Sequence, residues 1–172
     1  STAGLLMGPY NVPAYECGVH CVITNKTGVG TFRAPGRYES CFIRERLLDM
    51  AAADLGIDPA ELRFKNLIQP SQMPYNAGRT RADGDTIFDS GNYPQALTRA
   101  LDEIGYEETN PKRWVDDAGR YHGIGIATYV KNTGRGPYEG ARIVISGTGD
   151  VDVYLGITTM GQGHETPMAQ IC

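Results

Sequence analysis

The chain has 172 residues and a formal net charge of −4, and 41% of its residues are hydrophobic and 21% charged. These fractions match ordinary soluble domains, so they predict one or two globular domains and exclude a disordered chain. The mild acidic excess provides no basic patch, which argues against a nucleic-acid partner. No apolar run approaches the roughly 20 residues that a membrane-spanning helix needs, so we expect no membrane segment and a cytoplasmic location.

Residues 1–88 are predicted to form a first domain that begins with strands and continues with helices. Residues 8–33 are rich in Val, Tyr, Thr and Ile, a composition typical of extended segments. Over residues 38–55, apolar side chains recur near helical spacing, and Gly56 supplies a stop. The recurring apolar residues are Phe42, Leu47, Met50, Ala51 and Leu55.

A second helix is predicted directly after the first. Asp58 is typical of an N-cap, Pro59 of a first helical residue, and Glu61 occupies the position of a capping-box side chain. Residues 68–90 are rich in Pro, Gly, Asn and Asp and show no periodicity, so they are interpreted as a linker or a long wrapping loop.

Residues 89–172 are predicted to form a second domain. An amphipathic helix is expected over residues 92–104, ended by Gly105, and a turn at residues 147–150 favours a hairpin. The three strands expected in this domain cover residues 121–130, 141–146 and 151–157. Helices and sheets that follow one another in this way predict an α+β fold with mixed sheets and packed helices.

A glycine-bearing segment near the end of the chain has the features of a binding loop. Gly161 and Gly163 permit positive φ and close approach to a ligand, and Thr166 followed by Pro167 is typical of an N-cap and a first helical residue. Unpaired N–H groups at such a helix start would suit a phosphate, and the Gln162 amide would suit a heterocycle. A polar turn before a helix is the alternative, and for an isolated Gly-Gln-Gly it is the commoner explanation.

The loop at residues 31–37 is the second candidate. Arg33 supplies a rigid fork of donors suited to phosphate or oxo groups and is followed by a Pro-Gly turn. An ordinary surface arginine is the alternative. Gly28 and Gly30 match the start of a dinucleotide fingerprint, but Arg33 stands at the third glycine position, which excludes a Rossmann site.

Two ordered blocks of residues together resemble a known family. The first block comprises Thr24 and Asn25, Gly30 to Gly36, Glu39, Glu45, Asp49, Ala52 and Gly56 to Leu67. The second comprises Gly123 to Ala127, a turn at 147–150, and Met160 to Thr166. In this order they are similar to the molybdenum-binding large subunit of the xanthine dehydrogenase, aldehyde oxidase and carbon monoxide dehydrogenase family. Two blocks about a hundred residues apart are far more specific than either motif alone.

The resemblance implies a molybdopterin cofactor, expected in its cytosine dinucleotide form, and hydroxylation of an aldehyde or N-heterocycle with a glutamate as base. That glutamate belongs to a motif beyond residue 172, so no catalytic residue is assigned within this chain and we expect the isolated chain to be inactive. The chain is interpreted as a fragment of the large subunit, either an excised piece or the product of a truncated gene. Its implied partners are the remainder of that subunit, an iron–sulfur subunit and a flavin subunit.

The resemblance also assigns cofactor-binding positions. Arg33 matches the arginine of the family's Phe-Arg or Tyr-Arg loop near molybdenum, with no direct protein ligand to the metal expected. Gln162 matches the glutamine of the Gly-Gln-Gly cofactor loop, and Gly161 and Gly163 match its glycines. We therefore predict that Arg33 and Gln162 face a shared open groove.

Three further positions bear on the substrate. Ala34 stands where aerobic carbon monoxide dehydrogenases place a copper-binding cysteine, which argues against carbon monoxide. Pro35 stands where xanthine oxidases place an aromatic residue that packs on the purine, which argues against purines. Tyr129 falls near a substrate-facing aromatic position, in a region where loop lengths differ.

The cysteines show neither zinc nor iron–sulfur spacing, so free thiols are expected at Cys17, Cys21, Cys41 and Cys172. One competing hypothesis is a stand-alone module that has lost catalysis and serves in binding or oligomerisation. A nucleotide-binding domain that uses the Gly-Gln-Gly loop is another, but it lacks a lysine or magnesium-binding partner at motif spacing. Because a piece of a larger subunit exposes apolar surface and strand edges, we expect the isolated chain to form homo-oligomers, with strands from 121 to 157 as the donors.

Overall fold

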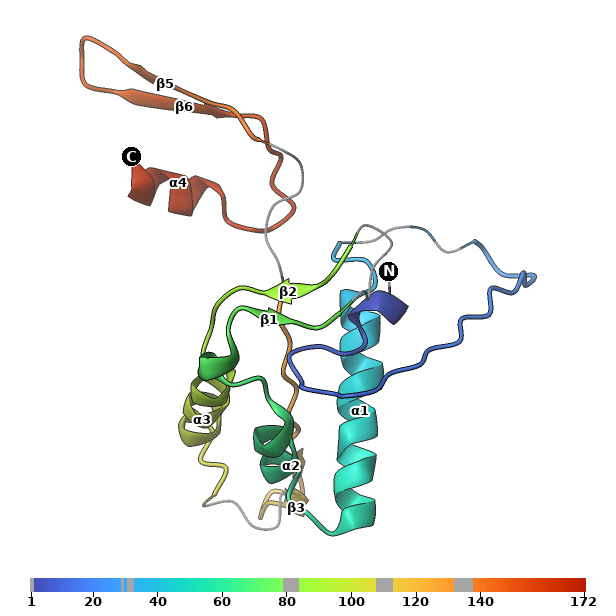
Figure 1. Ribbon diagram of the computed structural model, residues 1–172. Coiled ribbons are helices and arrows are strands. Elements are labelled where there is room, and N and C mark those ends of the chain that lie inside the picture. The colour runs from blue at the N-terminus through green and yellow to red at the C-terminus, as the bar shows by residue number, and fades with distance from the viewer. Residues whose placement is uncertain (1, 29, 31–32, 79–83, 108–112, 132–137) are drawn as a thin grey trace. The chain divides into compact units, whose positions relative to one another are not determined.

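The computed structural model describes residues 2–28, 30, 33–78, 84–107, 113–131 and 138–172. The chain separates into two compact units, Ser1–Lys131 and Asn132–Cys172 (Figure 1). This division differs from the sequence-based boundary after residue 88, which stays a prediction.

In its described residues, the first unit combines helices with two short antiparallel strand pairs. Its helices are η1 (Ala3–Leu5), α1 (Arg37–Leu55), α2 (Pro59–Asn66), η2 (Pro70–Gln72) and α3 (Tyr93–Glu103). Its hairpins pair β1 (Tyr75–Asn76) with β2 (Ile87–Phe88) and β3 (Arg113–Val115) with β4 (Tyr121–Gly123). The second unit consists of the antiparallel pair β5 (Ala141–Ile145) and β6 (Val151–Leu155), followed by α4 (Glu165–Ile171). The predicted α+β class is confirmed.

The ends of α1 and α2 follow from local chemistry. Gly56 adopts φ +64° and ends α1, as glycine does at many helix C-termini. The Asp58 carboxylate accepts hydrogen bonds from the backbone N–H groups of Ala60 at 2.7 Å and Glu61 at 3.3 Å, which confirms the predicted N-cap. Glu61 does not complete a capping box; its carboxylate instead pairs with Lys65 one turn along the helix, at 2.6 Å.

Helix α3 supplies the apolar side of the core. Asn92 caps it by accepting a hydrogen bond from the Gln95 N–H at 3.1 Å, and Gly105 follows its end with φ +63°. The predicted amphipathic helix is therefore confirmed. The buried core residues around it are Tyr10, Ala60, Leu67, Leu97, Leu101 and Tyr106.

Helix α1 is buried along a polar face rather than along its apolar one. Its buried residues are Ser40, Arg44, Glu45 and Ala52. The apolar residues that predicted the helix include Phe42, Leu47, Met50 and Leu55, and these side chains are exposed. The helix itself was predicted correctly, but charged groups take the interior positions.

The long strands expected from composition are shorter in the structure. Between residues 8 and 33, the described part contains one isolated bridge, Tyr10 to Leu67, and residues 11–28 belong to no strand. The strand expected over 121–130 is limited to β4, and residues 124–130 belong to no ladder. Half-buried and exposed side chains alternate from 124 to 129, as they do in extended chain. The loop expected over 68–90 contains η2, β1 and β2. Among the described residues, none of the helices is both long and apolar enough to cross a membrane.

Candidate functional site

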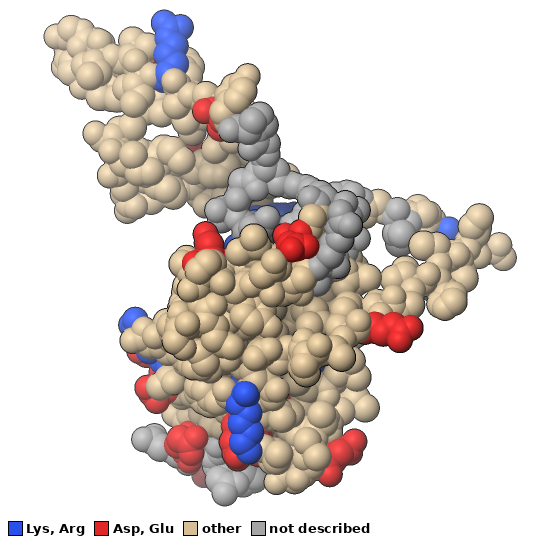
Figure 2. Space-filling view, viewed as in Figure 1, with Lys and Arg blue, Asp and Glu red and all other residues tan. Residues whose placement is uncertain are grey.

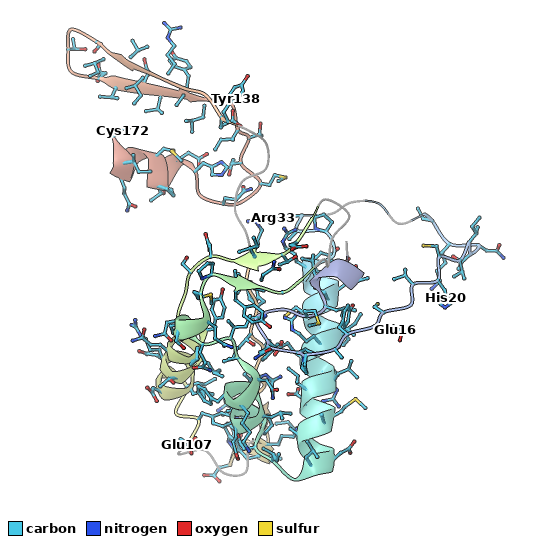
Figure 3. All side chains as sticks on the ribbon, viewed as in Figure 1. Glu16, His20, Arg33, Glu107, Tyr138 and Cys172 are labelled. Atoms are coloured by element: carbon cyan, nitrogen blue, oxygen red, sulfur yellow. The ribbon has the colours of Figure 1, made fainter. Side chains whose placement is uncertain are left out.

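The loop that bears Arg33 leads directly into α1, and Figure 3 labels Arg33 on an exposed bend. Ala34 adopts φ +60°, the left-handed region, and is the one described non-glycine residue to do so. An alanine in this region costs of order 1–3 kcal/mol, and such conformations cluster at functional sites. Gly36 follows with φ +79° and is buried. The Ala34 carbonyl accepts from the Arg37 N–H at 3.1 Å, which fixes the loop onto the helix.

A buried carboxylate oxygen lies one turn beyond this loop. Glu39 occupies the first turn of α1, and its Oε2 atom makes no hydrogen bond within the part of the chain that the structure describes. A buried, unsatisfied carboxylate oxygen costs free energy unless a partner outside the chain satisfies it. The loop and the first turn of α1 therefore offer both donors and an unsatisfied acceptor.

The second unit carries the Gly-Gln-Gly loop before α4. Gly161 and Gly163 adopt φ +93° and φ +70°, and a Cβ atom on Gly163 would meet nothing within 4 Å. Gln162 is exposed, and its Oε1 atom accepts a hydrogen bond from the Met160 N–H. That contact leaves the two N–H donors of the Gln162 amide without a partner among the described residues.

The helix after this loop begins earlier than predicted. Helix α4 starts at Glu165 with His164 at the N-cap position, so the assignment of Thr166 as N-cap was wrong. The Thr166 N–H donates to the Gly163 carbonyl at 3.1 Å and is already used within the turn. The buried Nδ1 atom of His164 has no hydrogen-bond partner among the described residues. Sequence reasoning gave His164 no role, and this unsatisfied nitrogen beside the loop adds it to the candidate site.

Tyr129 lies in the first unit, on the extended segment after β4. Its side chain is 69% exposed. The residue before it, Thr128, is fixed by a cluster of buried polar groups, which we call the Glu45 cluster and define as Tyr10, Arg44, Glu45, Arg63 and Thr128. Glu45 is 4% exposed and Arg63 is fully buried.

The Glu45 carboxylate is the centre of this cluster. It accepts hydrogen bonds from Arg44 Nε at 2.7 Å, Arg63 Nε at 3.0 Å, the Tyr10 hydroxyl at 3.0 Å and the Thr128 N–H at 3.1 Å. Burial, reinforced by the nearby Glu45 charge, raises the pKa of the Tyr10 hydroxyl far above its ordinary value, so this group stays a donor. Burial alone would lower the pKa of Arg63, but its hydrogen bonds to Glu45 and Asp49 outweigh that effect and raise it.

A cavity of about 370 Å³ lies elsewhere in the first unit, between α1, the start of α2 and residues 124–126. None of the predicted site residues lines it. On the face shown in Figure 2, the Lys and Arg side chains of the described residues lie singly and form no patch. Within the described residues, no group of three or more acidic, histidine or cysteine side chains could hold a metal ion, and the four cysteines are free.

Arg33 belongs to the first unit and Gln162 to the second. Their shared groove stays a prediction. Each loop separately presents the donor set that suits an anionic cofactor with a heterocycle: a guanidinium in the first, and a carboxamide with glycine backbone in the second.

Comparison with known proteins covers both loops. A molybdopterin cofactor-binding domain family matches residues 1–67, and a second family with the same description matches residues 99–172. The gamma subunit of the 6-hydroxypseudooxynicotine dehydrogenase complex of Paenarthrobacter nicotinovorans is 39% identical to 99% of this chain. The carbon monoxide dehydrogenase large chain of Afipia carboxidovorans is 34% identical to 95% of it. In each case the chain covers 22% of the relative.

The crystal structure of quinoline 2-oxidoreductase from Pseudomonas putida 86 is similar to 99% of this chain, with a TM-score of 0.69 and 26% sequence identity, and the chain covers 23% of it. The fold is thus that of molybdopterin-binding domains, and both loops lie within the matched regions. The chain belongs to the family of molybdenum-binding large subunits that includes xanthine dehydrogenase and carbon monoxide dehydrogenase, and it spans about a fifth of the length of the curated relatives that it matches.

Proposed function

We propose that this chain is the part of a molybdenum hydroxylase large subunit that holds a molybdopterin cofactor through two loops. Arg33 would bind an anionic or oxo group near the molybdenum, and Gln162 with the backbone of Gly161 and Gly163 would bind the pterin or its nucleotide. When bound, the cofactor supplies the molybdenum centre at which oxygen from water is transferred to carbon.

One observation carries this proposal: both candidate loops lie inside the matched cofactor-binding regions, Arg33 within residues 1–67 and Gln162 within residues 99–172. The left-handed Ala34 beside Arg33 supports it, because such strain persists where function requires it. The unsatisfied buried atoms of Glu39 and His164, one beside each loop, also fit a group that is bound from outside the chain.

The substrate class and partners belong to the same proposal. We propose an aldehyde or an N-heterocycle as substrate of the intact assembly, with Ala34, Pro35 and Tyr129 facing it. The intact assembly would add an iron–sulfur subunit and a flavin subunit, and the cytosine dinucleotide form of the cofactor is the one we expect.

Cofactor retention tests the proposal directly. The chain should be purified from a host that makes molybdopterin, and its molybdenum should be measured by plasma mass spectrometry alongside the fluorescence of the oxidised pterin. Arg33→Ala and Gln162→Ala should each lower retention, whereas Arg142→Ala, an exposed arginine on β5, should not. Retention that is equal in all three variants would contradict the assignment of the loops.

We expect the isolated chain to show no hydroxylase activity even where it retains cofactor. The glutamate that serves as base in the family lies outside this chain, and a general base alone supplies about 10²- to 10⁴-fold of rate. The measurement is turnover of aldehyde and N-heterocycle substrates. Turnover that co-purifies with molybdenum through further chromatography would show that this chain contains its own base.

We also expect the isolated chain to self-associate. Among the described residues, no third strand pairs with the hairpin of β5 and β6, and Ile145 on it is 71% exposed. Val22, in the segment 11–28 that belongs to no strand, is 79% exposed. Such edges and apolar side chains favour pairing between chains. Light scattering should report a mass that rises with concentration in the micromolar range. Ile145→Lys and Val22→Lys should reduce that rise, and a monomer at every concentration would contradict the expectation.

A further inference from the structure

We infer that Glu45 is a positioning residue that fixes the backbone of Thr128 and, through it, the exposed ring of Tyr129. A role for Tyr129 in a substrate site rests on the proposed function. The positioning rests on the contacts of the Glu45 cluster alone, all of which lie inside the first unit.

Every polar group of Thr128 is held by this cluster. Its N–H donates to Glu45 Oε2 at 3.1 Å, and its carbonyl accepts from Arg44 Nη2 at 2.8 Å. Its hydroxyl bonds the Tyr10 hydroxyl, which in turn donates to Glu45 Oε2 at 3.0 Å. A residue whose amide, carbonyl and side chain are all bonded to buried groups has little freedom to move.

The cluster also holds the residue two positions earlier. Arg63 Nη2 donates to the Ile126 carbonyl at 3.0 Å, while its Nε donates to Glu45 Oε2 at 3.0 Å. In extended chain, successive side chains point to opposite sides. Ile126 and Thr128 are half-buried, and Ala127 and Tyr129 are exposed. The contacts on one side of the segment therefore determine where Tyr129 projects on the other.

Side-chain contacts, rather than pairing with a neighbouring strand, position residues 124–130. Residues 124–130 belong to no strand ladder within the described chain, so neighbouring backbone does not set their path. Glu45 is the group that joins the contacts, because its carboxylate accepts from Arg44, Arg63, Tyr10 and Thr128 together. Three of these donors reach Oε2, and the fourth, Arg44 Nε, reaches Oε1, so both carboxylate oxygens act as acceptors. A glutamine at position 45 would place an NH₂ group, itself a donor, against either Arg44 or the three donors at Oε2, and would lose those hydrogen bonds.

Fluorine NMR of the chain labelled with 3-fluorotyrosine, together with amide hydrogen exchange, tests this inference. Tyr129→Phe identifies the Tyr129 resonance. In Glu45→Gln, we expect that resonance to shift or broaden and the Thr128 amide to exchange at least about tenfold faster. Asp49→Asn is the matched control, because Asp49 bonds Arg63 at 2.9 Å but makes no hydrogen bond to residues 124–130. It should leave both signals unchanged.

Two milder variants cover the case in which Glu45→Gln does not fold. Thr128→Val and Tyr10→Phe each remove one hydroxyl of the cluster and keep its charges, and each should move the Tyr129 resonance while the circular dichroism stays that of the wild type. The inference is overturned if folded Glu45→Gln leaves the Tyr129 resonance and the Thr128 amide unchanged. It is equally overturned if Glu45→Gln unfolds and neither milder variant moves the resonance. Failure of the proposed function would appear as molybdenum retention that Arg33→Ala and Gln162→Ala leave unchanged, and it would leave these NMR and exchange signals as expected.

Discussion

Replacing Arg63 with Met should lower the free energy of unfolding by about 3–5 kcal/mol, the cost of breaking a buried ion pair from one side. Arg63 is fully buried and is ion-paired with Glu45 and Asp49 at 3.0 and 2.9 Å. Removing it leaves the Glu45 carboxylate, 4% exposed, with one cationic partner instead of two, because only Arg44 remains. Domains of this size have a total free energy of unfolding of about 5–15 kcal/mol, so the variant should be close to unfolding.

Lys65→Met is the matched control, two residues further along α2. Lys65 also forms an ion pair, with Glu61 at 2.6 Å, but both side chains are more than half exposed. An exposed pair of this kind contributes about 0–1 kcal/mol. Urea denaturation followed by circular dichroism measures both variants. If Arg63→Met and Lys65→Met lower the free energy of unfolding equally, the buried Glu45 cluster stabilises the fold no more than an exposed ion pair does.

A double replacement separates the free energy that the ion pair contributes to stability from the cost of leaving one buried charge without its partner. Glu45→Met with Arg63→Met removes both opposite charges, so we expect it to be less destabilising than the sum of the two single replacements. Apolar residues of similar size can replace a buried ion pair at small cost. A loss equal to the sum would mean that the two residues act independently.

The helices could be predicted from the sequence because their signals are local. Asp58 before Pro59, Asn92 before α3, and Gly56 after α1 act within one turn of the chain, so no knowledge of distant contacts is needed. The interior of α1 could not be predicted in the same way. Periodicity assumes that apolar residues point inward, whereas Arg44 and Glu45 are buried because Arg63 and Thr128, far along the chain, satisfy them.

The strands could be predicted less well than the helices, because a strand depends on a pairing partner that can lie far along the chain. Residues 11–28 have strand composition but make no ladder within the described chain, and a strand exists only where another strand pairs with it. The turn of β5 and β6 was predicted correctly, since its partner lies a few residues away.

For the candidate site, the sequence allowed the motif residues to be located but did not allow their backbone conformations to be predicted. The Arg33 and Gln162 loops were identified by residue type and order. The left-handed Ala34 had no signal in the sequence, because alanine rarely adopts φ +60°. The unsatisfied atoms of Glu39 and His164 depend on three-dimensional burial and were equally invisible.

Replacing Gly8 with Ala should lower the free energy of unfolding by about 2–5 kcal/mol, from two sources that a control can separate. Gly8 adopts φ +58°, a conformation that costs an L-residue about 1–2 kcal/mol. A methyl group on Gly8 would also lie 2.6 Å from Arg44 Nε and 2.7 Å from Arg44 Nη1. Such overpacking costs about 1–3 kcal/mol more.

Gly56→Ala is the control, because Gly56 has a similar φ of +64° and nothing within 4 Å of an added Cβ. It should show the backbone cost alone, about 1–2 kcal/mol. The difference between the two variants then measures how firmly Arg44 is held, since a guanidinium that could swing away would accept the methyl group without loss. Arg44 donates to the Leu5 and Leu6 carbonyls at 3.3 Å, to Thr128 and to Glu45, so we expect it to resist. Equal losses for Gly8→Ala and Gly56→Ala in urea denaturation would mean that Arg44 yields, and that the cluster does not fix the start of the chain against α1.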